Sequence, residues 1–156
     1  MTINSNLVSA LGRTKIHQLI GEISMLMFNS ELHKRYIIND IGAVILPPIN
    51  LNQFRVYKIK DKPVGFIAWA MLSPELGKKY SQERYSLQLD DWQTGNEMWI
   101  TDFLAPFGHA KEIINDFREI YPNTIAHSIR VDATGQLQKI NKWTGKKVVQ
   151  PSRKVR

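Results

Sequence analysis

Residues 64–72, VGFIAWAML, form an almost unbroken apolar run with the length of one strand. Such a run is typical of a central strand that is covered on both faces. The preceding segment, QFRVYKI at 53–59, is separated from it only by the polar turn KDKP. The two segments therefore predict an antiparallel hairpin, and MWITDFLA at 98–105 predicts a third strand.

Helical patterns surround these strands. Apolar side chains recur with helical spacing over residues 14–28 and 110–121, and a shorter helix is expected after Ser73. Pro47 and Pro48 in AVILPPI predict an extended connection, because proline ends a strand and restricts the residue before it. Two further strands are expected in the segments TIAHSIRV and LQKINKW. The order predicts an α/β (α+β) single domain with a central mixed, antiparallel-rich sheet flanked by helices.

The charge of the chain is unevenly distributed. The 156 residues suffice for one domain with a core and carry a formal net charge of +7. Residues 1–132 hold 14 acidic and 14 basic side chains, so the whole excess lies after them. We therefore expect a domain at 1–147 and a mobile basic tail at 148–156. Such basicity usually indicates nucleic acid, an acidic membrane or an acidic protein partner.

Several classes of protein are excluded or disfavoured. The absence of cysteine excludes disulfides, thiolate zinc sites and a cysteine acyl-enzyme. No apolar run reaches the roughly 20 residues that cross a bilayer, and the N-terminus lacks the pattern of a secretory signal. We therefore expect a cytoplasmic protein without a membrane span. No glycine-rich phosphate loop is present, and the four histidines lack metal-ligand spacing, so we expect neither nucleotide hydrolysis nor a metal.

Asp102 is the first candidate site residue. Strand alternation places it on the same face as the apolar Ile100 and Leu104, and opposite Phe103. A carboxylate among apolar neighbours is costly to bury unless a partner compensates its charge. The pattern is equally compatible with a functional acid and with a structural ion pair.

His33 is the second candidate, and it lies three residues after Ser30. If Ser30 caps a short helix, His33 falls in the first turn, where the helix dipole favours the neutral imidazole that a general base requires. An exposed histidine beside Lys34 and Arg35 is the simpler interpretation. Arg130, in a late strand, is a candidate anion contact, although a salt bridge is the commoner role of such an arginine.

In combination, these segments resemble the family of RTX-toxin-activating lysine acyltransferases. The resemblance covers about residues 20–147 and is carried by the combination of LH, DW-x-x-G, W-x-x-D-x-x-APFG and IRVD. The matching stretches are GEISMLMFNSELHKRY, ILPPINLNQF, PVGFIAWAMLSPELGKKY, DDWQTGNEMWITDFLAPFG, YPNTIAHSIRVD and GKKV. Glu31 departs from the pattern, since a proline is usual before Leu-His.

The resemblance implies a GNAT-like acyltransferase fold. It implies transfer of a fatty acyl group from acyl carrier protein to internal lysine ε-amines of an RTX-type protoxin. The family's catalytic residues fall on His33 and Asp102, its serine on Ser30 and its late-strand arginine on Arg130. No bound cofactor is expected, because the donor is acyl-ACP with its 4'-phosphopantetheine arm. The acidic carrier protein would suit the basic tail, and a homodimer is compatible with the family.

The residue chemistry agrees with this implication and leaves alternatives open. His33 would accept the lysine proton during direct attack on the thioester, while Asp102 would hold the imidazole or the lysine in position. A Ser30 ester is the weaker option. The other functions considered are a small basic nucleic-acid-binding module and a Ser-His-Asp hydrolase, which is less favoured because the nucleophile elbow is missing. Of these we expect the acyltransferase, with no nucleic-acid partner.

Overall fold

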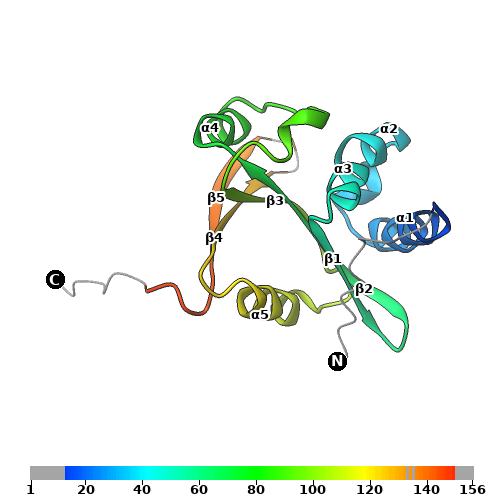
Figure 1. Ribbon diagram of the computed structural model, residues 1–156. Coiled ribbons are helices and arrows are strands. Elements are labelled where there is room, and N and C mark those ends of the chain that lie inside the picture. The colour runs from blue at the N-terminus through cyan, green and yellow to red at the C-terminus, as the bar shows by residue number, and fades with distance from the viewer. Residues whose placement is uncertain (1–12, 133, 135, 150–156) are drawn as a thin grey trace.

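The structure, a computed structural model, describes residues 13–132, 134 and 136–149. The described residues form a five-stranded sheet in the order β1-β2-β3-β4-β5 (Figure 1). Neighbouring strands are antiparallel except for β3 and β4, which run parallel. The strands are β1 (Phe54–Ile59), β2 (Lys62–Leu72), β3 (Glu97–Leu104), β4 (Ile125–Val131) and β5 (Leu137–Thr144). The predicted mixed, antiparallel-rich sheet is confirmed.

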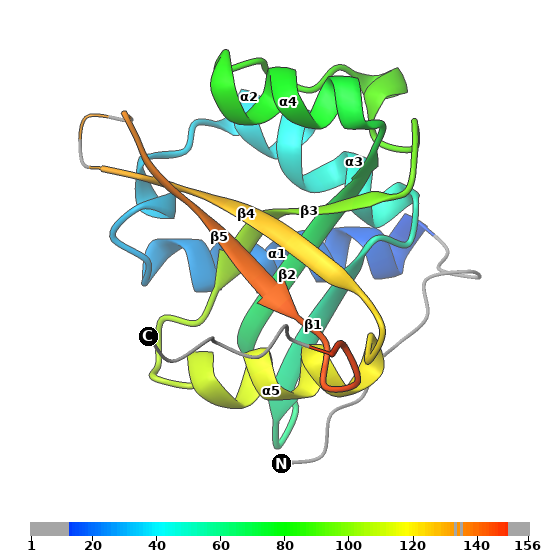
Figure 2. The same cartoon turned by 90° about the vertical axis from the view of Figure 1, so that its left-hand side faces the viewer.

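Helices lie on both faces of the sheet (Figures 1 and 2). The first face carries α1 (Arg13–Phe28), α2 (Ile38–Asp40), α3 (Leu46–Asn50) and α4 (Pro74–Gln82), and the opposite face carries α5 (Ala110–Ile120). Ser73 caps α4 as predicted, because its side chain accepts the Leu76 N–H at 3.2 Å. A GNAT-like, α/β acyltransferase fold is consistent with this arrangement of a mixed sheet between helical layers.

The hairpin of β1 and β2 forms where the sequence predicts it. Lys60 and Asp61 make the turn with φ values of 47° and 63°, the positive φ that a two-residue hairpin turn requires. Most of β2 is buried. Its Phe66 packs toward α1, whereas its Trp69 packs with Ile113 of α5. Each large apolar side chain contributes about 1.5–3 kcal/mol to the free energy of unfolding when it is buried. Packing against both helical layers therefore stabilises this strand.

The prediction for AVILPPI is wrong, because the segment is helical. A π-helix over Ile41–Ile45 joins α2 to α3, and the Leu46 N–H bonds to the Ile41 carbonyl. Pro47 and Pro48 then begin α3, where missing N–H groups and a fixed φ near −65° are tolerated.

The predicted grouping of Asp102 with Ile100 on one strand face is also wrong. The pairing of β2 with β3 contains a bulge in which Thr101 is the extra residue of β3. A bulge reverses the alternation of side chains along the strand. Leu104 and Asp102 therefore face α1, while Ile100 packs on the α5 face. Phe103 lies on the α5 face, opposite Asp102 as predicted but on the same face as Ile100.

The parallel pair of β3 and β4 is short. It joins Met98, Trp99 and Ile100 to residues 126–128, and the two strands are no longer paired beyond that point. The part of β3 that is no longer paired with β4 begins at Thr101 and carries Asp102, which stays paired with Ala68 of β2. The strands therefore separate next to a buried carboxylate.

Residues 150–156, which hold most of the predicted basic tail, lie outside the described residues. Within the part of the chain that the structure describes, no helix is long and apolar enough to cross a membrane.

Candidate functional site

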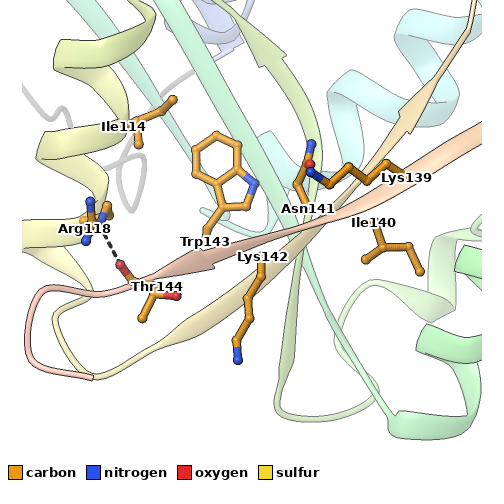
Figure 3. Close-up of a pocket in the computed structure, with 8 residues that line it drawn as sticks. All are labelled: Ile114, Arg118, Lys139, Ile140, Asn141, Lys142, Trp143 and Thr144. Atoms are coloured by element: carbon orange, nitrogen blue, oxygen red, sulfur yellow. Dashed lines mark hydrogen bonds between the residues drawn. The ribbon is translucent and has the colours of Figure 1, made fainter. Parts of the chain in front are cut away.

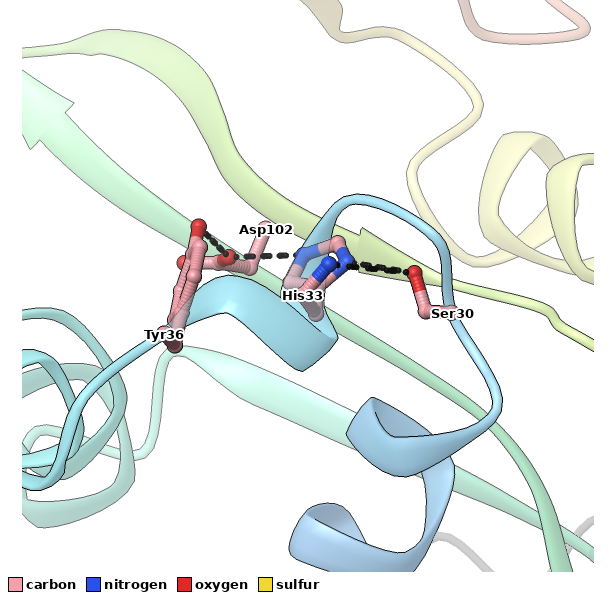
Figure 4. A network of polar contacts seen from close by, with 4 residues as sticks. All are labelled: Ser30, His33, Tyr36 and Asp102. Carbon is pink, nitrogen blue, oxygen red and sulfur yellow. Dashed lines mark hydrogen bonds and ion pairs between the residues drawn. The ribbon is translucent and has the colours of Figure 1, made fainter.

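His33 begins a short 3-10 helix, η1 (His33–Arg35), directly after the loop that follows α1. Ser30 orders this turn in the way that the sequence suggests. Its carbonyl accepts the Lys34 N–H at 2.9 Å, and its Oγ accepts the His33 N–H at 3.4 Å. The same Oγ lies 2.8 Å from Nδ1 of the imidazole (Figure 4). The alternative of an exposed histidine is wrong, since His33 is only 5% exposed.

Asp102 meets the other side of the imidazole. Its Oδ1 lies 3.1 Å from His33 Nε2, although the two residues are 69 positions apart in the sequence. The hydroxyl of Tyr36 donates to the same Oδ1, also at 3.1 Å (Figure 4). The structure thus brings together Ser30, His33 and Asp102 and adds Tyr36 as a fourth member.

Burial controls the protonation of this network. It raises the pKa of Asp102, and the contacts with His33 and Tyr36 oppose that increase. Burial, followed by the nearby Asp102 charge, raises the pKa of Tyr36, so the phenol keeps its proton and remains a donor. The desolvated carboxylate therefore depends on its two donors to stay ionised.

The contacts also indicate which imidazole nitrogen can act as a base. When Asp102 is ionised, its carboxylate accepts hydrogen bonds and cannot donate them, so the proton between His33 and Asp102 then belongs to Nε2. Nδ1 then carries the lone pair and accepts the Ser30 hydroxyl. The site can therefore remove a proton at Nδ1 while Asp102 stabilises the resulting imidazolium.

A cavity of about 350 Å³ lies where β3 and β4 separate. Its walls come from β3 (residues 100–103), β4 (residues 128–131), the β5 side chains Asn141 and Trp143, and the η1 region with His33 and Tyr36. Phe103 and Trp143 belong to the α5 face of the sheet, whereas His33 lies on the α1 face. The cavity therefore passes between the two strands and ends at the imidazole.

A second cavity, of about 620 Å³, adjoins it between α5 and β5 (Figure 3). It shares Asn141 and Trp143 with the first cavity. Lys139 lies on the same side of β5 as these two residues, while Ile140 and Lys142 lie on the other side (Figure 3). Arg118 closes one end, because its Nε donates to the Thr144 carbonyl at 2.6 Å.

Arg130 lies on the wall of the cavity between the strands and is exposed. It pairs directly with Lys139 across β4 and β5, so two cationic residues occupy opposed strand positions, each on the wall of one of the two adjoining cavities. Like charges in opposed strand positions destabilise a sheet. An anion bound at this place would remove that cost, which agrees with the interpretation of Arg130 as an anion contact.

Two residues of the site, Tyr36 and Thr101, were not predicted from the sequence. Tyr36 follows His33 by one turn of a 3-10 helix, and this spacing was the one signal available. Thr101 occupies the bulge, lines the cavity and has a buried Oγ1 without a hydrogen-bond partner among the described residues. No local pattern indicates either the bulge or the unpartnered hydroxyl.

The remaining histidines do not join the site. His17 is exposed on α1, His109 precedes α5, and His127 stacks on Trp99 with ring centroids 5.1 Å apart. In the described ranges, no group of three His, Cys, Asp or Glu side chains is arranged to hold a metal ion.

Comparison with known proteins agrees with this geometry. A family model described as "HlyC: RTX toxin acyltransferase family" matches residues 12–144. The RTX-I toxin-activating lysine-acyltransferase ApxIC of Actinobacillus pleuropneumoniae is 33% identical over 131 residues, 84% of this chain and 76% of that protein. The protein-lysine myristoyltransferase HlyC of Escherichia coli is 31% identical over 131 residues, with 84% and 77% covered. An uncharacterised protein of Synechocystis is 36% identical over 122 residues, with 76% and 83% covered. The chain therefore belongs to the RTX toxin acyltransferase family.

Proposed function

We propose that the protein transfers a fatty acyl group from acyl carrier protein to lysine ε-amines of an RTX-type protoxin. One observation carries the proposal: the buried His33–Asp102 pair stands at the end of a cavity that passes between two separating parallel strands. Membership of an acyltransferase family supports it, as do the names of relatives, which include toxin-activating lysine-acyltransferase and protein-lysine myristoyltransferase.

The substrate amine sets the chemical task. A lysine with a pKa near 10.4 is almost entirely ammonium at neutral pH, and supplying the free amine costs about 4 kcal/mol. His33 is positioned as the base, since its neutral form has a lone pair at Nδ1. Because that lone pair accepts the Ser30 hydroxyl, a proton from the amine has to pass through this hydroxyl or displace it.

The transfer proceeds by direct attack of the amine on the thioester carbonyl carbon. A C–N bond forms and the C–S bond breaks. The ammonium proton leaves to solvent before the attack. The nitrogen of the free amine then loses one proton to His33, and the departing sulfur of the carrier arm receives that proton from the imidazolium. Asp102 holds the imidazole through Nε2 and stabilises the cation between these two proton transfers.

The oxyanion requires donors at the cavity wall. Beyond Ile100, the edge of β3 that faces β4 is not used in the strand pairing. We assign the oxyanion to this edge, where the unpartnered Oγ1 of Thr101 also lies.

The donor arm enters from the α5 face. The phosphopantetheine arm carries one phosphodiester, and the cations Arg130 and Lys139, on the walls of the two adjoining cavities, offer it an anion contact. A carrier protein is acidic, so the exposed Lys142, which lines the second cavity, adds favourable charge at the entrance. The cytoplasm, where acyl carrier protein is found, is the corresponding compartment.

The test uses purified protein, acyl carrier protein loaded with a fatty acid, and protoxin. Mass spectrometry should detect the acyl group on defined protoxin lysines, and His33→Ala and Asp102→Ala should lose this activity by at least about a hundredfold. His17→Ala is the matched control, because His17 is exposed on α1 and does not line the cavity. Full acylation by both site variants would refute the assigned roles.

A serine ester is a second candidate mechanism, because Ser30 Oγ contacts His33 Nδ1 at 2.8 Å. A hydroxyl is activated as a nucleophile when a base contacts it and an acid orients that base. Ser30, His33 and Asp102 have this arrangement. Direct attack predicts that Ser30→Ala retains measurable transfer and that no acyl-enzyme accumulates without protoxin. An ester on Ser30, detected by mass spectrometry of enzyme mixed with donor alone, would replace direct attack.

A further inference from the structure

A third cavity also touches His33, and only His33 and Tyr36 among its lining residues belong to the cavity between β3 and β4 as well. It has a volume of about 120 Å³ and lies between the end of α1 and the start of α2. His33 and Tyr36 line both this cavity and the one between β3 and β4, so their rings stand where the two meet. The remaining wall is largely apolar and includes Met27, Ile37 and Ile41.

Apolar side chains continue from this cavity onto the surface. Phe28, Ile37 and Ile38 all line it and are 69%, 66% and 84% exposed. Large aliphatic and aromatic side chains at such exposure are unfavourable in water when they are clustered. The small cavity and these three residues therefore form one apolar track that begins at the imidazole and runs outward.

We propose that this track binds the fatty acyl chain of the donor, with the first carbons in the cavity and the remainder along Phe28, Ile37 and Ile38. The inference rests on the proposed acyl transfer. A thioester at His33 has its pantetheine arm on one side of the carbonyl and its alkyl chain on the other. The arm occupies the cavity between the strands, and the apolar track leads away from the other cavity that His33 lines.

The size and chemistry of the track fit an alkyl chain better than a lysine side chain. The lysine has a charged end and only four methylene groups, whereas the track is apolar and extends beyond the cavity onto the surface. An alkyl chain longer than the cavity would cover exposed apolar side chains of the protein, so the apolar surfaces of the ligand and of the protein would both be removed from water. Binding should therefore strengthen with chain length.

Ser24 provides a direct test, because it lines the cavity from α1 and none of the hydrogen bonds described involves its side chain. Ser24→Phe should fill the cavity. The probes are acyl carrier proteins that carry octanoyl, myristoyl or palmitoyl groups. We expect kcat/KM for the myristoyl and palmitoyl donors to fall about tenfold or more, the effect of about two lost methylene contacts, with a smaller change for octanoyl.

Met25→Phe is the matched control on the next residue of α1. Met25 lines a different apolar cavity, of about 550 Å³, between α1, the hairpin and Phe107. This variant should leave the chain-length profile unchanged. A shift of the profile in Met25→Phe but not in Ser24→Phe would overturn the proposal and assign the chain to that larger cavity.

Ile38→Ser provides a second test of the acyl-chain site if Ser24→Phe does not fold. Ile38 is mostly exposed, so its replacement should leave thermal unfolding unchanged while raising KM for palmitoyl donor more than for octanoyl donor. An unchanged profile in both variants, with acylation intact, would overturn the acyl-chain site and leave the proposed function standing. A change in oligomeric state without a change in profile would identify the patch as a contact between copies. If the wild type acylates nothing, the proposed function itself fails.

Discussion

Tyr36→Phe is the most informative single substitution, because it removes one hydroxyl and leaves the ring in place. The hydroxyl donates to Asp102 Oδ1 at 3.1 Å, and the ring packs against His33 with centroids 5.0 Å apart. The variant therefore isolates the hydrogen bond from the packing. We expect Tyr36 to act as a positioning residue that keeps Asp102 ionised and aligned with the imidazole.

The magnitude follows from the nature of the acceptor. A hydrogen bond to a charged group contributes about 1.5–3 kcal/mol, which corresponds to roughly a 10- to 150-fold loss in kcat/KM if the bond is needed in the transition state. The Tyr36 contact lowers the pKa of Asp102 against the raising effect of burial. Its removal should thus raise the pKa of Asp102 further, and the acid limb of the rate profile should move to higher pH.

The assay is acyl transfer at a series of pH values, with thermal unfolding measured in parallel. Tyr80→Phe is the control, because Tyr80 is influenced by the Asp102 charge without being one of the hydroxyls that donate to it. That variant should keep the wild-type profile. A Tyr36→Phe protein with the wild-type rate and the wild-type acid limb would show that the hydroxyl has no role in holding the carboxylate.

Three further outcomes are expected. Asp102→Asn should abolish most activity yet unfold at a higher temperature than wild type near neutral pH. The raised pKa of Asp102 means that its contribution to stability is present below the ordinary value of 3.8 and is lost as pH rises through the folded-state value. Equal melting temperatures of the two proteins between acidic and neutral pH would refute this. Gly95→Ala should destabilise the protein by about 1–3 kcal/mol in chemical denaturation, because the new Cβ would lie 2.5 Å from the Leu72 carbonyl oxygen and from Ser73 Cα. Truncation after Lys147 should raise KM for carrier protein more than it lowers kcat at low salt; an unchanged KM would remove the tail from the docking surface.

The regular elements could be predicted because local patterns determine them. The apolar run of β2, the polar turn before it and the helical spacing in α5 are each visible in a few consecutive residues. Ser73 with Pro74 at the start of α4 is a local signal of the same kind. These elements were placed correctly, since their burial and their local preference agree.

The errors have a different origin. Pro47 and Pro48 ended a strand in the prediction, whereas tertiary packing places them in a helix after a π turn. The bulge at Thr101 reversed the face of Asp102 relative to Ile100, and nothing in the alternation of MWITDFLA indicates an extra residue. Both features depend on what surrounds the segment and not on the segment itself.

The candidate site was accessible only in part. Pattern alone left His33 and Asp102 as separate candidates, and the resemblance to the acyltransferases assigned them to one site. Their contact spans 69 positions, so no local argument could predict it. Tyr36 as the second donor to the carboxylate and the cross-strand pair of Arg130 with Lys139 required the coordinates, because strand register decides which side chains meet.

We propose that His33 and Asp102 catalyse acyl transfer to lysine. The most direct measurement is mass spectrometry of protoxin after incubation with acyl carrier protein and either wild-type protein or His33→Ala, with His17→Ala as the control. We expect acyl-lysine with the wild type and with His17→Ala, and a loss of at least about a hundredfold in its rate of formation with His33→Ala. Acylation of the same lysines at the wild-type rate by a folded His33→Ala protein would contradict it.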